Sequence, residues 1–107
     1  MSNPIDKKLE VSMLLQTYGG LLTDKQREYL NLYINEDLSL NEISDDYNVS
    51  RAAIYDAIHK ATDILEKYET SFHVLAKQEQ LQNIVEKYKA SNNEEVKQII
   101  KEIEEIL

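Results

Sequence analysis

The side chains best suited to chemistry in this sequence gather near the middle of the chain, at Ser50, Arg51, Ala52, Tyr55, His59 and Lys60. In a helix, most of these six share one side, because neighbours on a helical face recur every three to four positions. A cation and an aromatic hydroxyl on the first turns of a helix can reach phosphates and base edges. We therefore take the six residues as candidate nucleic-acid contacts. The alternative interpretation is an ordinary solvated helix face.

The stretch 39–61 predicts two short helices joined by a tight turn, which would hold this cluster. Ser39 and Glu42 form an S-x-x-E capping box, the signature of a helix start. One apolar stripe follows at spacings of three and four, formed by Leu40, Ile43 and Tyr47. Asn48 tolerates the left-handed conformation that ends a helix, and Ser50 is a good N-cap for the next one. Helix, turn and helix together predict a helix-turn-helix, whose second helix suits a DNA major groove.

The second of these helices has a continuous apolar side, formed by Ile54, Ala57, Ile58, Ala61 and Leu65. The pattern continues to Tyr68, and we expect Glu69-Thr70-Ser71 to end it. Upstream, Thr23 and Gln26 form another capping box, opening a helix whose apolar positions should face the helix-turn-helix. These positions are Leu30, Tyr33 and Ile34, flanked by Tyr29 and Leu32.

The first helix should begin at Asn3-Pro4 and end at Gly19-Gly20, with glycine in the left-handed region. Its apolar residues cover more than one stripe: Leu9, Val11, Met13, Leu14, Leu15 and Tyr18. Such a wide apolar surface predicts burial on two sides, within one molecule or against a second copy.

Two further amphipathic helices are expected after residue 70. The first has a stripe of Val74, Leu75, Leu81, Ile84, Val85 and Tyr88, and the second has Val96, Ile99, Ile100, Ile103 and Ile106. Ser91 and Glu94 form the capping box between them. We expect an antiparallel hairpin over 70–107, packed on residues 1–69 or on a partner, in a single compact all-α domain.

The composition excludes several functional classes. A chain of 107 residues without cysteine has no disulfide framework, thiolate zinc site or thiol nucleophile. His59 and His73 lie in separate predicted helices, with no motif for catalysis or phosphate binding. We expect no enzyme, no cofactor and no metal site. The sequence lacks a signal-peptide pattern and any apolar run of about 20 residues, so we expect a cytoplasmic protein without membrane insertion.

The charge opposes nucleic-acid binding. The chain carries a net charge of −8, and residues 21–68 contain five basic against ten acidic residues. Asp56 stands in the candidate recognition helix, where an acid would face phosphates or bases. A typical nucleic-acid-binding domain is basic on at least one face, so this charge favours a basic protein partner as the alternative.

Residues 22–65 resemble the fourth conserved region of bacterial sigma factors, which reads promoter elements. The matching positions are Leu22, Gln26, Arg27 and Leu30, then Leu40, Glu42, Ile43 and Ser44, then Val49, Ser50 and Arg51, and finally His59, Lys60 and Ala61. The chain departs from that pattern at Ser44, Tyr47, Asn48 and Asp56. The resemblance implies a sigma-type helix-turn-helix fold.

Residues 11–44, the helix-turn-helix and the acidic helical tail together resemble the YlxM family of small bacterial proteins. The resemblance implies a setting in the signal recognition particle pathway, and it supplies no catalytic residues. Two hypotheses follow. One is a regulatory protein that binds DNA, or the RNA of the particle, through the helix-turn-helix. The other is an adaptor that binds the protein subunit of the particle through an acidic and apolar helical surface. The surplus of apolar positions predicts a homodimer in either case.

Overall fold

The computed structural model describes residues 4–107, and this part of the chain is helical without strands, as the predicted all-α class requires. The elements in chain order are α1 (Pro4–Tyr18), the 3-10 turn η1 (Gly19–Leu21), α2 (Asp24–Ile34), α3 (Leu40–Tyr47), α4 (Arg51–Phe72), α5 (Val74–Tyr88) and α6 (Glu94–Ile106). One compact unit ends at Phe72, and the second is His73–Leu107. Asn3, expected at the start of α1, lies outside the described residues.

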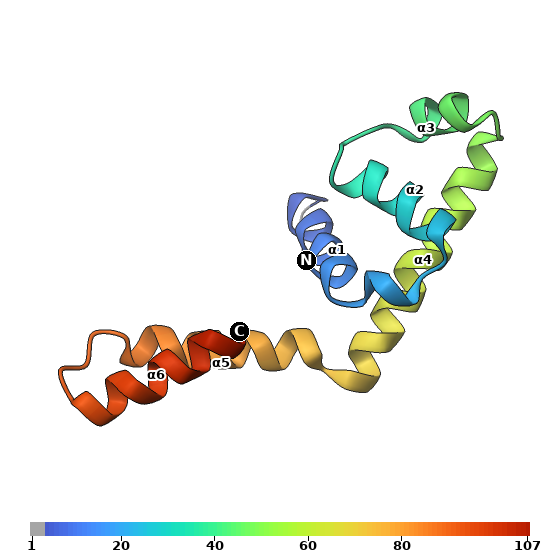
Figure 1. Ribbon diagram of the computed structural model, residues 1–107. Helices are drawn as coiled ribbons and strands as arrows, with labels where there is room; N and C mark the ends of the chain where they lie inside the picture. The colour runs from blue at the N-terminus through green and yellow to red at the C-terminus, as the bar shows by residue number, and fades with distance from the viewer. Residues whose placement is uncertain (1–3) are drawn as a thin grey trace. The chain divides into compact units, whose positions relative to one another are not determined.

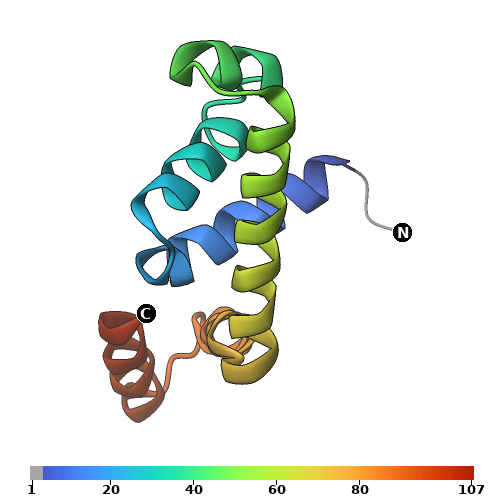
Figure 2. The same cartoon turned by 90° about the vertical axis from the view of Figure 1, so that its right-hand side faces the viewer.

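Helix α4 is the central element of the first unit, and α1, α2 and α3 all pack against it (Figures 1 and 2). Its predicted apolar side is confirmed: Ile54, Ile58, Ala61 and Leu65 are buried, and Ala57 is half-buried. Leu30 of α2 and Ile43 of α3 are fully buried beside them. Each such side chain contributes about 1.5–3 kcal/mol relative to an exposed one, so this core fixes the direction in which α4 faces solvent.

Helix α4 is longer than the sequence indicated. It continues past Tyr68 to Phe72, so the expectation that residues 69–71 end it is wrong. The hydroxyl of Thr70 donates to the carbonyl oxygen of Glu66 over 2.9 Å, which satisfies a polar side chain inside the helix. The break comes at His73, whose φ of 55° is left-handed.

Helix α1 contacts both α2 and α4, and its apolar surface is only partly used. Its buried side chains are Val11, Leu14, Leu15 and Tyr18. Leu9 is 61% exposed and Met13 38% exposed. The ring of Tyr18 stacks on that of Tyr68, with centroids 5.9 Å apart. The expected burial on two sides therefore holds within the first unit for most, though not all, of this surface.

The end of α1 differs from the prediction in its mechanism. The helix ends at Tyr18, but neither glycine has a positive φ, and Gly19 and Gly20 continue into a 3-10 turn. Gly19 is buried, and a Cβ there would lie 3.1 Å from a methyl carbon of Leu15. Glycine is therefore useful at this position for close packing and not for left-handed backbone.

The unit His73–Leu107 is an antiparallel hairpin in which α5 and α6 lie side by side (Figure 1), as predicted. Within this unit the buried side chains are Val85 and Ile100. The predicted capping box of Ser91 and Glu94 is wrong. Asn93 is the N-cap of α6, and its side-chain oxygen accepts from the backbone N–H groups of Glu95 and Val96 over 2.9 and 3.1 Å.

None of the helices in the described residues combines the length and the apolar content that a membrane span requires.

Candidate nucleic-acid interface

The predicted capping box at the start of α3 is present. The hydroxyl oxygen of Ser39 accepts from the backbone N–H of Glu42 over 3.1 Å, and the Glu42 carboxylate accepts from the backbone N–H of Ser39 over 3.0 Å. Ser44 is buried at a position where the sigma-factor pattern has alanine. Its hydroxyl donates to the carbonyl oxygen of Asn41 over 2.9 Å. The hydroxyl therefore enters the core without an unsatisfied polar group.

The turn between α3 and α4 has the predicted geometry. Asn48 is left-handed, with φ 54° and ψ 46°, and the backbone N–H of Val49 donates to the carbonyl oxygen of Ser44 over 3.1 Å. The hydroxyl oxygen of Ser50 then accepts from the backbone N–H of Ala53 over 3.0 Å, which caps α4. These contacts, with buried Ile43 and Ile54, fix α4 relative to α3.

All six candidate contact residues are exposed: Ser50, Arg51, Ala52, Tyr55, His59 and Lys60. The structure brings Tyr55 and His59 together, with ring centroids 5.5 Å apart and planes at 18°. Tyr55 is 55% exposed, so this stacked pair leaves aromatic surface open to solvent on the outer side of α4. Such a surface can stack on a base or lie against a sugar.

The sequence interpretation missed an ion pair on this helix. Lys60 Nζ lies 2.9 Å from a carboxylate oxygen of Asp56. Both side chains are well exposed, so the pair contributes little to stability. The pair nevertheless joins Lys60, a candidate phosphate contact, to Asp56, the acid expected to repel phosphates. The i, i+4 spacing of the two residues is the signal that could have found it.

Arg51 lines a surface depression beside the start of α3, together with Lys8 and Tyr33. Lys8 Nζ is 2.8 Å from a carboxylate oxygen of Asp37 and 5.2 Å from the centre of the Tyr33 ring. The hydrogen bond from Lys8 to Asp37 raises the pKa of Lys8 and lowers the pKa of Asp37. Of the two cations at this depression, Lys8 is thus held by a carboxylate, whereas no ion pair within the described residues engages Arg51.

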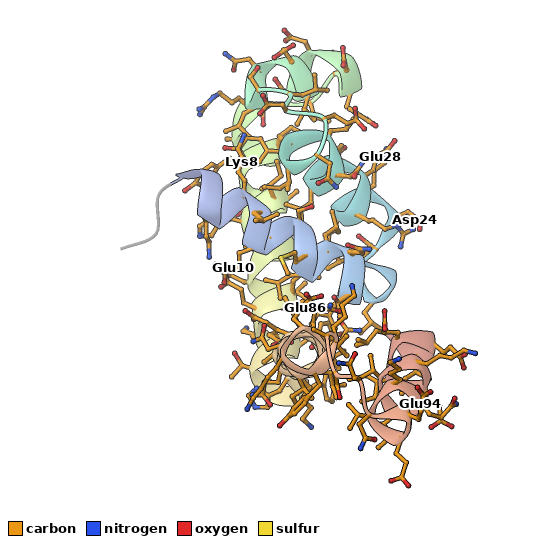
Figure 3. All side chains as sticks on the ribbon, turned by 90° about the vertical axis from the view of Figure 1, so that its left-hand side faces the viewer. Lys8, Glu10, Asp24, Glu28, Glu86 and Glu94 are labelled. Carbon is orange, nitrogen blue, oxygen red and sulfur yellow. The ribbon has the colours of Figure 1, made fainter. Side chains whose placement is uncertain are left out.

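Acidic side chains are exposed on α3 and on the neighbouring helix α2. Asp45 and Asp46 are exposed on α3, and Asp24 and Glu28 project from α2 (Figure 3). The hydrogen bond from the Tyr47 hydroxyl to Glu28 raises the pKa of Tyr47 to about 12. The acidity counted in the sequence therefore lies on the molecular surface, where it acts on approaching charged molecules.

Within the described residues, no group of three or more histidine or acidic side chains has the arrangement to hold a metal ion.

The core around α4, the left-handed turn at Asn48 and the exposed first turns of α4 define a helix-turn-helix protein. Residues 5–106 match the UPF0122 family, described as "Putative helix-turn-helix protein, YlxM / p13 like". The chain belongs to this family, which confirms the resemblance to YlxM proteins inferred from the sequence.

Its relatives are similar over almost their whole length. A "Probable UPF0122 protein" of Mycoplasma mycoides is 43% identical over 106 residues, which cover 99% of this chain and 93% of the relative. A UPF0122 protein of Mycoplasma capricolum is 42% identical over the same length. One of Bacillus cereus is 39% identical over 108 residues, covering 95% of this chain and 98% of the relative. The similarity therefore includes both the helix-turn-helix and the tail hairpin.

Proposed function

We propose that this protein is a cytoplasmic regulatory protein of the signal recognition particle pathway that binds nucleic acid through its helix-turn-helix. The observation that carries the proposal is the arrangement of α4. Ile54 and Ile58 anchor its first turns in the core, so Arg51 and Tyr55 are held facing outward on a rigid helix. A side chain on a packed helix is better positioned for recognition than one on a loop.

Each candidate residue has a role in this proposal. Arg51 contacts a phosphate or the edge of a guanine, and the ring pair of Tyr55 and His59 stacks on sugar or base. Ala52 is small enough to admit close approach of a thymine methyl group. Ser50 fixes the first turn of α4 through its cap, and Lys60 contacts phosphate when it leaves Asp56.

Two nucleic acids suit the proposal in different ways. A DNA major groove admits α4 along its length, as the sigma-like order of motifs favours. The deep major groove of A-form RNA does not, so the RNA of the signal recognition particle would be bound at loops or at its minor groove. A homodimer would present two α4 helices, and on DNA these suit half-sites about 34 Å apart.

Binding at several salt concentrations tests the proposal. We expect the logarithm of affinity for labelled duplex DNA, or for the particle's RNA, to fall linearly with the logarithm of salt concentration. Arg51→Ala should reduce the magnitude of that slope by about one, because one phosphate contact is lost. Lys67→Ala is the matched control: Lys67 is exposed on the same helix, about 24 Å further along at 1.5 Å per residue.

A slope near zero for both nucleic acids would overturn phosphate-driven binding. Equal losses in Arg51→Ala and Lys67→Ala would mean that the total charge matters and the first turns of α4 do not.

The acidic surface favours a second candidate function, an adaptor that binds the basic protein subunit of the signal recognition particle. Asp45 and Asp46 are exposed on α3, and Lys60 is already paired with Asp56. Complementary charge raises the association rate and the specificity of a protein complex. Purified particle protein, treated with nuclease, should then still bind the chain. Loss of binding on removal of RNA would exclude direct protein contact and favour the first function.

A further inference from the structure

The tail hairpin His73–Leu107 is small and has few buried side chains. Units below about 40 residues usually need disulfides, a metal or association with another chain. This chain has no cysteine, and the buried side chains of the hairpin are Val85 and Ile100. Isolated helices of this length are marginal in water, so covering the remaining apolar surface would stabilise the hairpin.

That surface has a defined place on the hairpin. We call tail face the four apolar side chains left exposed on one side of it: Ile84 (46%), Tyr88 (45%), Ile99 (54%) and Ile106 (81%). Ile84 and Tyr88 lie four positions apart on α5, and Ile99 and Ile106 lie seven apart on α6. Each pair therefore forms one row along its helix. Val85 and Ile100 are the buried residues of α5 and α6. Counted from them at 3.6 residues per turn, both rows fall on the same side of the antiparallel pair.

The two edges of the tail face carry opposite charge. On α5, Lys77 and Lys87 lie on or beside the edge, and Lys87 Nζ is 5.3 Å from the centre of the Tyr88 ring. On α6, Glu95 and Glu102 lie within one turn of Ile99. Within the described part of the chain no ion pair engages these four charges. The tail face is thus apolar along its middle, basic at its α5 edge and acidic at its α6 edge.

We infer that the tail face binds the tail face of a second copy of this chain, with α5 of each copy against α6 of the other. A two-fold axis along the hairpin places the basic edge of one copy on the acidic edge of the other, twice in each dimer. It also makes every neighbouring pair of helices antiparallel, as in a four-helix bundle. The inference rests on the proposed homodimer for its occupant and does not depend on nucleic-acid binding.

Sedimentation of the full chain between about 1 and 100 micromolar, which would detect a dimer with a dissociation constant in that range, tests the inference. We expect a dimer at the higher concentrations. Ile99→Glu should weaken it by about 100-fold, because an unpaired acid would enter an apolar interface. Leu9→Glu is the matched control, since Leu9 is 61% exposed in the first unit. Helix content from circular dichroism should be unchanged in the control.

Charge reversal keeps the test decisive if Ile99→Glu unfolds the hairpin. Lys77→Glu with Lys87→Glu should weaken the dimer by about 10-fold, and so should Glu95→Lys with Glu102→Lys. The fourfold variant should recover it, because the edges become complementary again.

A wild-type monomer at about 100 micromolar would overturn the inference. A dimer lost in Leu9→Glu but kept in Ile99→Glu would overturn the tail interface while leaving the proposed homodimer in place. Failure of the fourfold variant to recover would overturn the pairing of α5 with α6.

Discussion

The two compact units of this protein differ in how completely they bury their apolar side chains. In the first unit, α1, α2 and α3 surround α4, and Leu30, Ile43, Ile54 and Leu65 are fully buried. In the hairpin His73–Leu107, α6 has Ile99 and Ile106 exposed and Ile100 buried. The first unit has a core of its own and can offer a polar, rigid helix face to a ligand. The hairpin has apolar surface left to offer, which suits it to association.

The largest expected effect tests the completeness of the first core. Leu30→Ala should lower the free energy of unfolding by about 2–5 kcal/mol, because it leaves a cavity where the side chain is fully buried. Leu9→Ala, at an exposed position of the same unit, should change it by less than about 0.5 kcal/mol. Urea unfolding followed by circular dichroism measures both. A small loss in Leu30→Ala would mean that the first unit is as loosely packed as the tail.

The turn that orients α4 should show a smaller effect. Asn48→Val should cost about 1–2 kcal/mol, because a β-branched side chain is strained at a φ of 54°. Asn48→Gly accepts that backbone conformation and should stay close to the native stability. Urea unfolding of both variants checks this. Equal losses would show that the Asn48 side chain, and not its backbone, matters at this position.

The N-cap of α6 should contribute measurably to the stability of the hairpin. Asn93→Ala should cost about 1 kcal/mol of local stability, because two backbone N–H groups of α6 lose their acceptor. Ser91→Ala should cost less, since its hydroxyl accepts from one backbone N–H, that of Asn93, over 3.2 Å. Amide hydrogen exchange in α6 measures both. A larger effect at Ser91 would restore the capping box that the sequence indicated.

The smallest expected effect concerns the hydrogen bond between Tyr47 and Glu28 on the surface of the first unit. The pKa of Tyr47 is raised to about 12 by its hydrogen bond to Glu28, above the usual value of about 10. The stability from this bond is therefore fully present below pH 10 and is lost as the pH rises toward 12. Wild-type stability should fall more than that of Tyr47→Phe between pH 9 and 11, roughly the onset of tyrosine ionisation. Parallel curves in urea unfolding would contradict this.

Local signals in the sequence predicted most of the first unit. The capping boxes at Thr23 and Ser39, the left-handed Asn48 and the cap at Ser50 all depend on neighbours within a few residues, and all are present. Two expectations about helix ends failed. Gly19 is not left-handed but packs closely on Leu15, and α4 continues to Phe72, where the left-handed His73 follows it.

The sequence predicted which residues of the candidate site are exposed. It did not predict which of its charged side chains form ion pairs. The helical period placed Arg51 and Tyr55 outside because Ile54 and Ile58 had to be inside. The pairing of Lys60 with Asp56 follows from i, i+4 spacing, but which cations stay available depends on side-chain positions. For the tail, the sequence showed a surplus of apolar residues, whereas the division into a buried and an exposed edge required the packing of α5 on α6.

The most direct test of the central claim, that α4 is the nucleic-acid-binding element, is a map of amide NMR signals during titration. Duplex DNA and the RNA of the signal recognition particle would be added in separate experiments. We predict that the signals of residues 50–60 shift with at least one of them and that those of α5 and α6 do not. Shifts confined to residues 73–107, or none with either nucleic acid, would contradict the claim.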